Sequence, residues 1–444
     1  MIFSSINFII FWLISLISTK FFNKSLILIL ILGLVFYSSQ GLVNFLSIFF
    51  IALVCSLFLL VKKFFYFFLI LILIPIFSFK YLNNIITFFN NNFIYQSIFS
   101  IVPFFETPIP PGLSFVTFSS IALLVFIKKN LNIRFIELFS FIYYYPHLIA
   151  GPIVRPEKLI PQLNNQKLFN FRSLALGIFI FTIGLFFKIV IADSIADYAN
   201  PKFLNPKEYS NDELLFTWIL FSQQIFYDFN AYTLMAIGVS KTLGVDLPEN
   251  FNSPYLSQSL SEFWRKWHIT LSNWIKDFIY IPLGGSRKNF FRNNLNILIS
   301  MIISGIWHGS GLNFIFWGTL NGIILCLEKV LLIKIYKIFP AFLRAIFIYL
   351  LITYLWLFFR VYKIDDIFIF HKALLEFNFL NIKIISLFAI ILLFNFFQKY
   401  TTIQYLENFF NSKNKLVIFT SSLIFIIFLL MSKTSTERFI YFNF

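Results

Sequence analysis

The sequence contains little charge and no long hydrophilic stretch. Only 12% of its 444 residues are Asp, Glu, Lys or Arg, whereas soluble globular domains carry about 25%. Hydrophobic residues make up 59% of the chain. This composition excludes an ordinary soluble protein. Because no polar segment is long enough to fold separately, we expect one membrane domain over residues 1–444 with short loops.

Other absences narrow the class further. The alternation of period two that marks a lipid-facing β-barrel is missing. The two cysteines, Cys55 and Cys326, form no CxxC motif and no disulfide framework. No GxSxG elbow, P-loop or GxGxxG motif is present. The apolar residues 1–19 lack a charged start and a small-residue cleavage site, so we interpret them as the first transmembrane segment.

The chain is instead rich in long apolar blocks. Each block approaches the roughly 17–25 residues that a helix needs to cross the hydrocarbon layer. The clearest are Leu42–Val61, Phe64–Phe79, Ser173–Ala192 and Phe342–Phe359. We predict an all-α integral membrane protein, a polytopic helical bundle of about 10–12 transmembrane helices with re-entrant or interfacial helices.

The net charge of +16 is consistent with a membrane partner. Basic loops stay on the cytoplasmic side and meet anionic lipid, so we expect membrane lipid as a partner and no nucleic acid. Within the single domain we expect N-terminal transmembrane helices over 1–104, a catalytic core over 105–320 and C-terminal transmembrane helices over 321–444. Polar, aromatic and glycine residues are concentrated in the middle region.

The first candidate site residue is a histidine inside an apolar stretch. Leu295–Trp317 reads LNILISMIISGIWHGSGLNFIFW and places His308 among three glycines. An ionisable group at membrane depth is costly and usually faces a bundle interior or an aqueous cavity. A neutral imidazole there could take a proton from an attacking hydroxyl. The residues alone leave two roles open, catalysis and a hydrogen bond that packs helices together.

A second histidine lies on a segment with helical periodicity. Ser261–Ile281, SEFWRKWHITLSNWIKDFIYI, repeats aromatic and aliphatic residues at helical spacing, with charged residues on other faces. This pattern predicts one amphipathic helix at a membrane interface. His268 belongs to it, and its distance in sequence from His308 disfavours a zinc site. For His268 the residues alone favour a structural role.

Further polar positions interrupt apolar runs. Tyr144–Pro156 contains three prolines and predicts an irregular turn, where lipid anchoring is favoured for Arg155. Asp228, among aromatic residues, is expected to hydrogen-bond to a neighbouring helix, with orientation of a catalytic histidine as the alternative. His371 follows a short polar loop, and we expect no catalytic role for it.

Six ordered blocks within roughly residues 105–320 carry a resemblance. They are PPGLSFVTF (Pro110–Phe118), YYPHLIAGPIVRP (Tyr144–Pro156), GLFFKIVIAD (Gly184–Asp193), QIFYDFNAYTLMAIG (Gln224–Gly238), ENFNSPYLSQSLSEFWRKWHITLSNWIKDFIYIPLGGSRKN (Glu249–Asn289) and GIWHGSGLNFIFWG (Gly305–Gly318). Together they resemble the membrane-bound O-acyltransferase superfamily, and within it the bacterial alginate O-acetyltransferase type. One position departs from that type, because Leu234 stands where its pattern has an acidic residue.

The resemblance implies a fold with a central tunnel and a catalytic histidine in its middle. It implies that His308 is that residue and that His268 is a second catalytic histidine. His308 would deprotonate an acceptor hydroxyl, which attacks the thioester carbonyl of an acyl donor. Four more residues are candidates to line the tunnel: Trp307, Asn313, Tyr227 and Asp228.

The resemblance also implies the partners and the location. Acetyl-CoA is the expected acyl donor and approaches from the cytoplasm, with no bound cofactor and no metal. An extracytoplasmic acetyltransferase partner protein would complete transfer to a polysaccharide, an alginate-like exopolysaccharide or peptidoglycan. The expected location is the bacterial cytoplasmic (inner) membrane, with multiple passes.

Two other functions stay open. Relatives that D-alanylate teichoic acid share the two histidine blocks, and the IPLGG at Ile281–Gly285 favours the acetyl branch over them. A membrane transporter would also place polar residues in the membrane, but it predicts repeated halves with matching broken helices, which the sequence does not show.

Overall fold

The computed structural model describes residues 3–22, 25–82, 109–129, 132–149, 151–165, 170–332, 338–361, 363–376 and 382–432. Within these ranges the regular elements are helices and no strand occurs, which confirms the all-α prediction. The helices group into two compact units, each described by itself below. Residues 83–108, where we expected the first region to meet the second, lie outside the described part of the chain.

The first unit comprises Met1–Thr182, Tyr232–Pro248 and Lys415–Leu430. In it α3, α4 and α6 pack together, and α2 packs against α7. Its helices are α1 (Ile6–Phe21), α2 (Leu26–Ser38), α3 (Leu42–Val61), α4 (Phe65–Phe77), η1 (Ser78–Leu82), α6 (Leu113–Lys128), α7 (Phe135–Ile142), η3 (Tyr145–His147), α8 (Pro156–Asn164), most of α9 (Phe171–Phe186), the end of α11 (Asn211–Thr242) and α21 (Lys415–Ser432).

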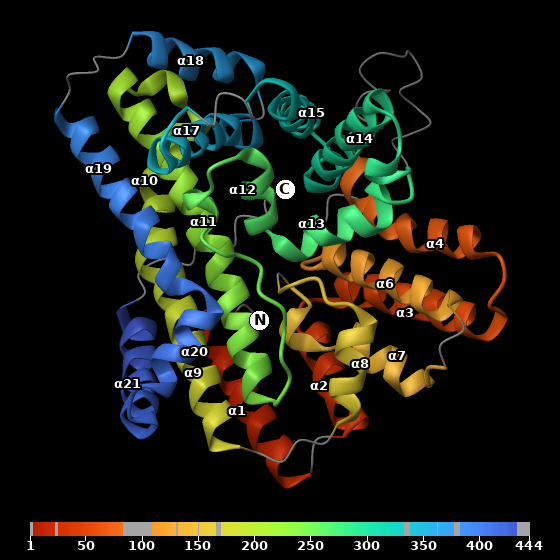
Figure 1. Cartoon of the computed structure of the whole chain (residues 1–444). Helices are drawn as coiled ribbons and strands as arrows, with labels where there is room; N and C mark the ends of the chain where they lie inside the picture. Colours follow the sequence, from red (N-terminus) through yellow and green to blue (C-terminus); the bar gives the residue numbers. More distant parts are fainter. Residues whose placement is uncertain are drawn as a thin grey trace, which may run out of the picture. The chain divides into compact units, whose positions relative to one another are not determined.

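The second unit comprises Ile183–Ala231, Glu249–Asn414 and Met431–Phe444. Besides the end of α9 and most of α11, it contains η4 (Phe187–Ala192), α10 (Asp193–Leu204), η5 (Pro206–Glu208), η6 (Pro254–Leu256), α12 (Leu260–Lys266), α13 (Ile269–Ile275), η7 (Lys276–Tyr280), η8 (Gly285–Arg287), α14 (Phe290–His308), α15 (Leu312–Leu327), η9 (Glu328–Leu332), α17 (Ala341–Arg360), α18 (Ile364–Leu375), α19 (Ile382–Phe397), η10 (Gln398–Thr401) and α20 (Ile403–Asn411). Figure 1 shows α14 and α15 side by side, and they make extensive contact.

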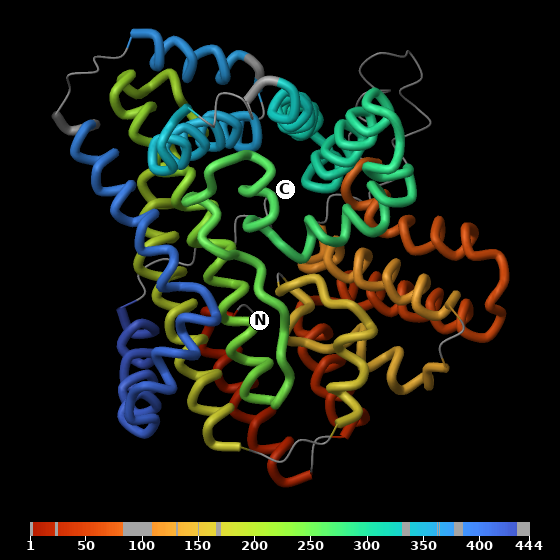
Figure 2. The backbone as a smooth tube through the Cα atoms, viewed as in Figure 1, coloured from red at the N-terminus to blue at the C-terminus, as the bar shows by residue number. Residues whose placement is uncertain are grey.

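Five helices among the described residues are long and apolar enough to cross a membrane. They are Leu42–Val61, Phe65–Leu82, Phe171–Leu204, Ala341–Arg360 and Lys415–Ser432. Three of them contain the predicted blocks Leu42–Val61, Ser173–Ala192 and Phe342–Phe359, and Phe65–Leu82 begins one residue after the start of the predicted block Phe64–Phe79. A sixth span is possible if the pair Ile385–Thr401 and Ile403–Asn411 counts as one, with a 65° bend that can be followed in Figure 2. The protein is therefore a multi-pass membrane protein.

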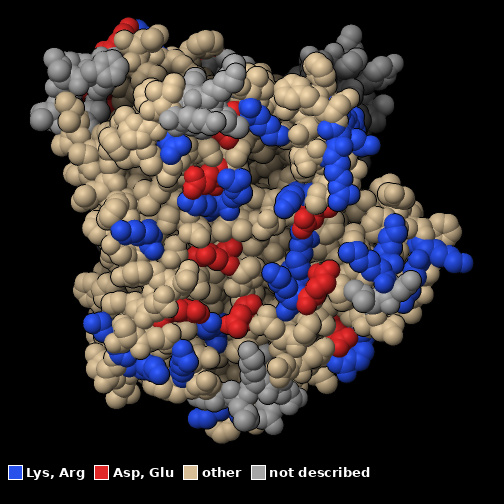
Figure 3. Space-filling view, in the orientation of Figure 1, with Lys and Arg blue, Asp and Glu red and all other residues tan. Residues whose placement is uncertain are grey.

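The surface of α3 shows how a span meets its surroundings. Its exposed apolar side chains recur every three or four residues, so they form one stripe along the helix. They include Leu42, Leu46, Phe49, Leu53, Leu57 and Leu60, and the exposed Val43, Phe50 and Val61 lie beside this stripe. On the face of the molecule in Figure 3, charged side chains gather in several groups, and the surface around these groups is uncharged. An exposed apolar stripe without charge suits contact with lipid chains.

The structure corrects the prediction of a single helix over Ser261–Ile281. The segment divides into α12, α13 and the π-helical turn η7, with the break at Trp267 and His268. His268 has the left-handed backbone conformation, with φ of 43° and ψ of 55°. The helical ladder stops there because the Ile269 N–H donates to the Asn250 carbonyl oxygen at 2.9 Å instead of to its own helix. The predicted irregular turn at Tyr144–Pro156 is confirmed for residues 144–149 and 151–155, where the short η3 is the one regular element before α8 begins at Pro156.

Candidate active site

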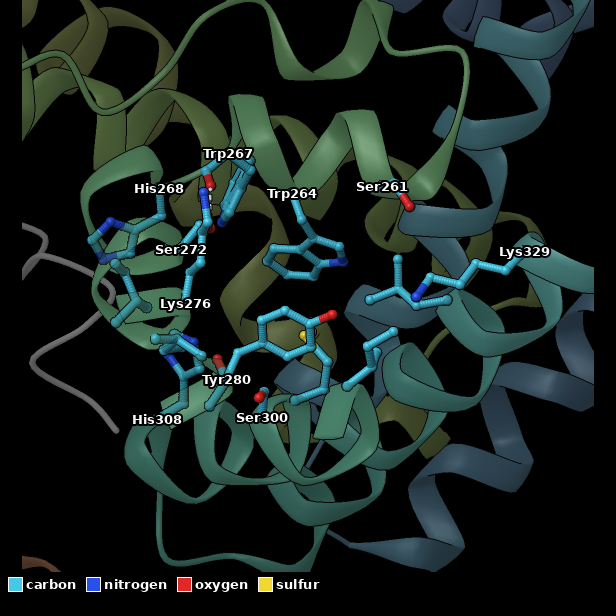
Figure 4. Close-up of a pocket in the computed structure, with 16 residues that line it drawn as sticks. Ser261, Trp264, Trp267, His268, Ser272, Lys276, Tyr280, Ser300, His308 and Lys329 are labelled. Atoms are coloured by element: carbon cyan, nitrogen blue, oxygen red, sulfur yellow. Dashed lines mark hydrogen bonds between the residues drawn. The ribbon is translucent and has the colours of Figure 1, made fainter. Parts of the chain in front are cut away.

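Both candidate catalytic histidines line one cavity in the second unit. The cavity has a volume of about 290 Å³, and its walls come from α12, α13 and η7 on one side and from α14, α15 and η9 on the other. In Figure 4 His268 and His308 lie at one end, and Ser261 and Lys329 lie at the opposite end. The fold thus brings together two histidines that are far apart in the sequence.

His308 is the last residue of α14. Only 5% of its surface is exposed, and three rings surround its imidazole. The ring centroids lie at 4.6 Å for Trp307, 5.2 Å for Trp317 and 5.0 Å for Phe359. Carbonyl groups at a helix C-terminus favour positive charge nearby. A positive charge on the His308 ring would therefore be favoured at this position.

The glycines near His308 let α14 and α15 approach closely. A β-carbon on Gly305 would lie 2.2 Å from the Phe314 carbonyl oxygen, and one on Gly318 would lie 2.4 Å from the Met301 carbonyl oxygen. Small residues of this kind allow close helix packing in membranes. The apolar stretch Leu295–Trp317 is therefore a tight helical hairpin, and His308 stands where its first helix ends.

His268 stands in the turn between α12 and α13 and is 1% exposed. Its imidazole meets the Phe229 ring edge-on at a centroid distance of 4.7 Å, and the Trp307 ring at 6.1 Å. The Nδ1 atom of His268 lies 3.2 Å from the Asn250 side-chain oxygen. Trp307 thus contacts the rings of both histidines, and Asn250 contacts the Nδ1 atom of His268.

The surroundings of the His268 ring favour its neutral form. The two seven-residue helices beside it are too short to cross a membrane. Burial lowers the pKa of His268 to about 3, because an imidazolium would lose its hydration inside the protein. Neutral imidazole can both donate and accept a hydrogen bond, as general acid–base chemistry requires.

The remaining wall of the cavity is partly polar. It includes the hydroxyl groups of Ser300 and Ser304 on α14 and the ring of Tyr280, whose hydroxyl donates to Asn293 Oδ1 at 2.8 Å. The exposed Lys276 and Lys329 add positive charge. The cavity therefore combines apolar walls and neutral histidine with two ammonium groups, a distribution that suits a long ligand with an anionic part.

A buried carboxylate holds α12 against this cavity. Glu328 accepts hydrogen bonds from the first backbone N–H groups of α12, at 2.5 Å from Leu260 and 3.1 Å from Ser261. Acidic groups are favourable at a helix N-terminus, where backbone N–H groups have no helical partner. Glu328 therefore stabilises the start of α12, next to Lys329 in the cavity wall.

Three other predicted site residues, Tyr227, Asp228 and Asn313, lie in the second unit but do not line the histidine cavity. Asp228 forms an ion pair with Lys188 of η4 at 2.8 Å, and Asp193 binds the same ammonium at 2.7 Å. This confirms the predicted bond from Asp228 to a neighbouring helix. Tyr227 packs edge-on against Phe187. Neither Tyr227 nor Asp228 is among the residues that line the histidine cavity.

Asn313 lines a second cavity of about 590 Å³, together with His371. Its amide nitrogen donates to the Phe358 carbonyl oxygen at 3.2 Å. His371 accepts or donates a hydrogen bond at 2.9 Å with the Tyr354 hydroxyl. The roles of Asn313, Tyr227, Asp228 and Trp307 in a tunnel stay predictions.

Several residues that shape the histidine cavity were not predicted from the sequence. They are Asn250, Phe229, Ser304, Lys329 and Phe359. Asn250 stands inside the longest block of the resemblance, but nothing in the sequence pairs it with His268. The described residues contain no group of three or more His, Cys, Asp or Glu side chains that could hold a metal ion.

Comparison with known proteins identifies the family. The sequence model of the membrane-bound O-acyltransferase family matches residues 128–359, which include both histidines and the whole cavity lining. The chain belongs to this family. The predicted resemblance is therefore confirmed for the family and its fold.

Several curated relatives of this member of the membrane-bound O-acyltransferase family carry functional names. A peptidoglycan O-acetyltransferase of Helicobacter pylori is 40% identical over 239 residues, 52% of this chain and 45% of the relative. A probable alginate O-acetylase of Azotobacter vinelandii is 35% identical over 285 residues, 63% of this chain and 57% of the relative. A teichoic acid D-alanyltransferase of Bacillus subtilis is 27% identical over 233 residues, 48% of this chain and 57% of the relative. The chain spans about half the length of the curated relatives it matches.

Proposed function

We propose that this protein transfers acetyl groups from acetyl-CoA for the O-acetylation of an extracytoplasmic polysaccharide. The observation that carries the proposal is the shared cavity of His268 and His308 in a member of this family. We place the protein in the bacterial inner membrane, with the donor on the cytoplasmic side. An extracytoplasmic acetyltransferase partner protein completes delivery to the polymer.

The proposed reaction uses His308 as general base. Its imidazole takes the proton of an acceptor hydroxyl while that oxygen attacks the thioester carbonyl carbon. Collapse of the tetrahedral intermediate breaks the C–S bond, and the imidazolium returns the proton to the leaving thiolate. The products are an acetate ester and free coenzyme A. Ser304 stands one helical turn before His308 on the same face of α14 and lines the cavity, so its hydroxyl can donate to the oxyanion.

The shape of the cavity supports a thioester donor. Apolar walls lead from Lys329 at one end to the histidines at the other (Figure 4). A pantetheine arm is long and narrow, and its thioester would reach the histidines while the phosphates of coenzyme A stay near the exposed lysine. Ammonium groups bind phosphate through charge-assisted hydrogen bonds.

The acceptor is proposed from the relatives. Two of the O-acetyl relatives, at 40% and 35% identity, carry the names of peptidoglycan and alginate enzymes. Peptidoglycan is therefore the first polymer to test and an alginate-like exopolysaccharide the second. The D-alanyltransferase relative is 27% identical, so ester-linked D-alanine on teichoic acid-type polymers is the alternative product.

The test measures the acyl group that mild base releases from purified surface polymers. Strains carry the wild-type gene, a deletion, or the deletion complemented with His308→Gln or His371→Gln. The second variant is the matched control, because His371 lies outside the histidine cavity. We expect acetate to fall in the deletion and to be restored by the His371 variant. Acetate in the His308 variant should stay near the level of the deletion, because loss of a general base lowers the rate of transfer about 10²–10⁴-fold.

Two results would contradict the proposal. Full acetylation with His308→Gln, at wild-type amounts of protein in the membrane, would exclude His308 as the base. Unchanged acetate together with loss of esterified D-alanine in the deletion would replace acetyl transfer by the D-alanyl alternative.

A further inference from the structure

Asn250 makes an unusual number of contacts to the turn that carries His268. Its side-chain oxygen lies 2.7 Å from Thr270 Oγ1, 3.3 Å from the Thr270 backbone nitrogen and 3.2 Å from His268 Nδ1. Its backbone carbonyl accepts the Ile269 N–H at 2.9 Å. Asn250 is fully buried. One residue therefore holds three consecutive positions of the break between α12 and α13.

These contacts define which ring nitrogen of His268 carries the proton. A backbone N–H can only donate, so the Asn250 atom that receives the Thr270 N–H must be the amide oxygen. The same oxygen faces His268 Nδ1. Because an amide oxygen only accepts, Nδ1 must be the donor and must carry the hydrogen. In a neutral ring the lone pair then belongs to Nε2.

The contacts of Asn250 hold the His268 backbone in an energetically unfavourable conformation. A non-glycine residue with φ of 43° is uncommon and persists only where surrounding contacts impose it. The hydrogen bonds from residues 268, 269 and 270 to Asn250 are such contacts. Strained residues of this kind cluster at functional sites.

We propose that Asn250 is a positioning residue that fixes the orientation and tautomer of His268, so that Nε2 is an acceptor in the cavity. This rests on the proposed function for its catalytic consequence. With its lone pair free to accept a hydrogen bond, Nε2 can bind the hydroxyl group that is to be acetylated. It can instead bind an amide N–H of the acyl thioester. It complements His308, since the two rings stand at the same end of the cavity (Figure 4).

The first test reads the tautomer without any substrate. The chain contains only four histidines, so protein labelled with ¹⁵N-histidine in lipid nanodiscs yields a short spectrum, and His268→Gln identifies the resonances of His268. We expect a neutral ring protonated at Nδ1 in the wild type. Asn250→Leu should move the proton toward Nε2, while Asn252→Leu, at an exposed asparagine two residues on, should leave the tautomer unchanged.

The second test reads catalysis. Asn250→Leu should lower kcat by at least about tenfold, because a misplaced catalytic group loses its alignment. Asn250→Asp keeps an oxygen acceptor, so it should recover most of the rate. Its added carboxylate favours the His268 imidazolium and should shift the pH profile of kcat/KM toward higher pH. The other titratable groups that line the cavity are His308, Lys276, Tyr280 and Lys329.

The outcomes separate this inference from the proposed function. A wild-type His268 protonated at Nε2, or an Asn250→Leu variant with unchanged tautomer and rate, overturns the role of Asn250. If Asn250→Leu does not fold, an Asn250→Asp variant whose pH profile coincides with that of the wild type overturns it equally. Protonation at Nδ1 in a protein that does not transfer acetyl groups would instead support the positioning role and refute the proposed function.

Discussion

Adding one methyl group to Gly305 should push α14, which ends at His308, away from α15. The new β-carbon would lie 2.2 Å from the Phe314 carbonyl oxygen, whereas a carbon–oxygen contact normally needs about 3.3 Å. The helices must therefore separate by about 1 Å. A methyl group on the facing Gly318 would also require the helices to separate, because its β-carbon would lie 2.4 Å from the Met301 carbonyl oxygen.

The expected cost follows from this separation. Overpacking a close contact typically costs about 1–3 kcal/mol, and a shift of about 1 Å in a catalytic group can lower the rate about 100-fold. We therefore expect Gly305→Ala to lower the acetyl-transfer rate about 10–100-fold. Because both glycines serve one helix contact, the double variant Gly305→Ala, Gly318→Ala should be less impaired than the product of the two single effects.

The assay compares initial rates in membranes that contain equal amounts of each variant, with thermal unfolding in detergent as a second measurement. Thr319→Val is the matched control, since it places a methyl group on α15 next to Gly318 at a partly exposed position. Rates within twofold of the wild type for both glycine variants would refute the argument that the hairpin must pack this closely. Strictly multiplicative effects would refute the shared contact.

Three further predictions concern charged groups. Lys329→Glu should raise the KM for acetyl-CoA roughly tenfold at low salt, with little change in kcat and with a smaller effect as salt is added; an equal effect from the exposed Lys288→Glu would contradict this. Lys188→Met removes the ammonium group that pairs with the buried carboxylates of Asp193 and Asp228. It should destabilise the protein by about 3–5 kcal/mol, which is more than the effect of Asp228→Asn, and thermal unfolding measures both. Glu328→Gln should lower the free energy of unfolding by about 1–2 kcal/mol. Each oxygen of Glu328 accepts one N–H of α12, and in glutamine one of these oxygens is replaced by an NH₂ group that cannot accept. An unchanged unfolding midpoint would argue against the helix-capping role.

Sequence pattern predicted the membrane spans well because hydrophobic length depends on composition alone. Leu42–Val61 is a span with the same bounds in the structure. The break at His268 could not be predicted in this way. Its flanking residues keep helical periodicity, and the Ile269 N–H leaves the helix only because a distant carbonyl, that of Asn250, is close enough to accept it. Periodicity measures local preference and contains no information on such a tertiary hydrogen bond.

In the candidate site, too, some residues could be predicted from the sequence and others depend on tertiary contacts. His308 was found because an ionisable side chain in an apolar stretch is unusual by itself. Its neighbours Trp317 and Phe359 were not assigned, since aromatic residues are common throughout this chain and their contact with the imidazole depends on how α15 and α17 pack. Asp228 was correctly expected to bond to a neighbouring helix, but the identity of Lys188 as its partner required the fold.

The aromatic environment of the two histidines also gives the protein a built-in optical probe. Five of its eight tryptophans form a connected cluster around the cavity, through ring contacts at 4.6–6.1 Å among themselves and with the histidines. Indole emission responds to the polarity around the ring and is quenched by a neighbouring imidazolium. Entry of a thioester or protonation of either histidine should therefore change the intrinsic fluorescence of the unlabelled protein, so that binding and proton transfer can be followed in time without a reporter dye.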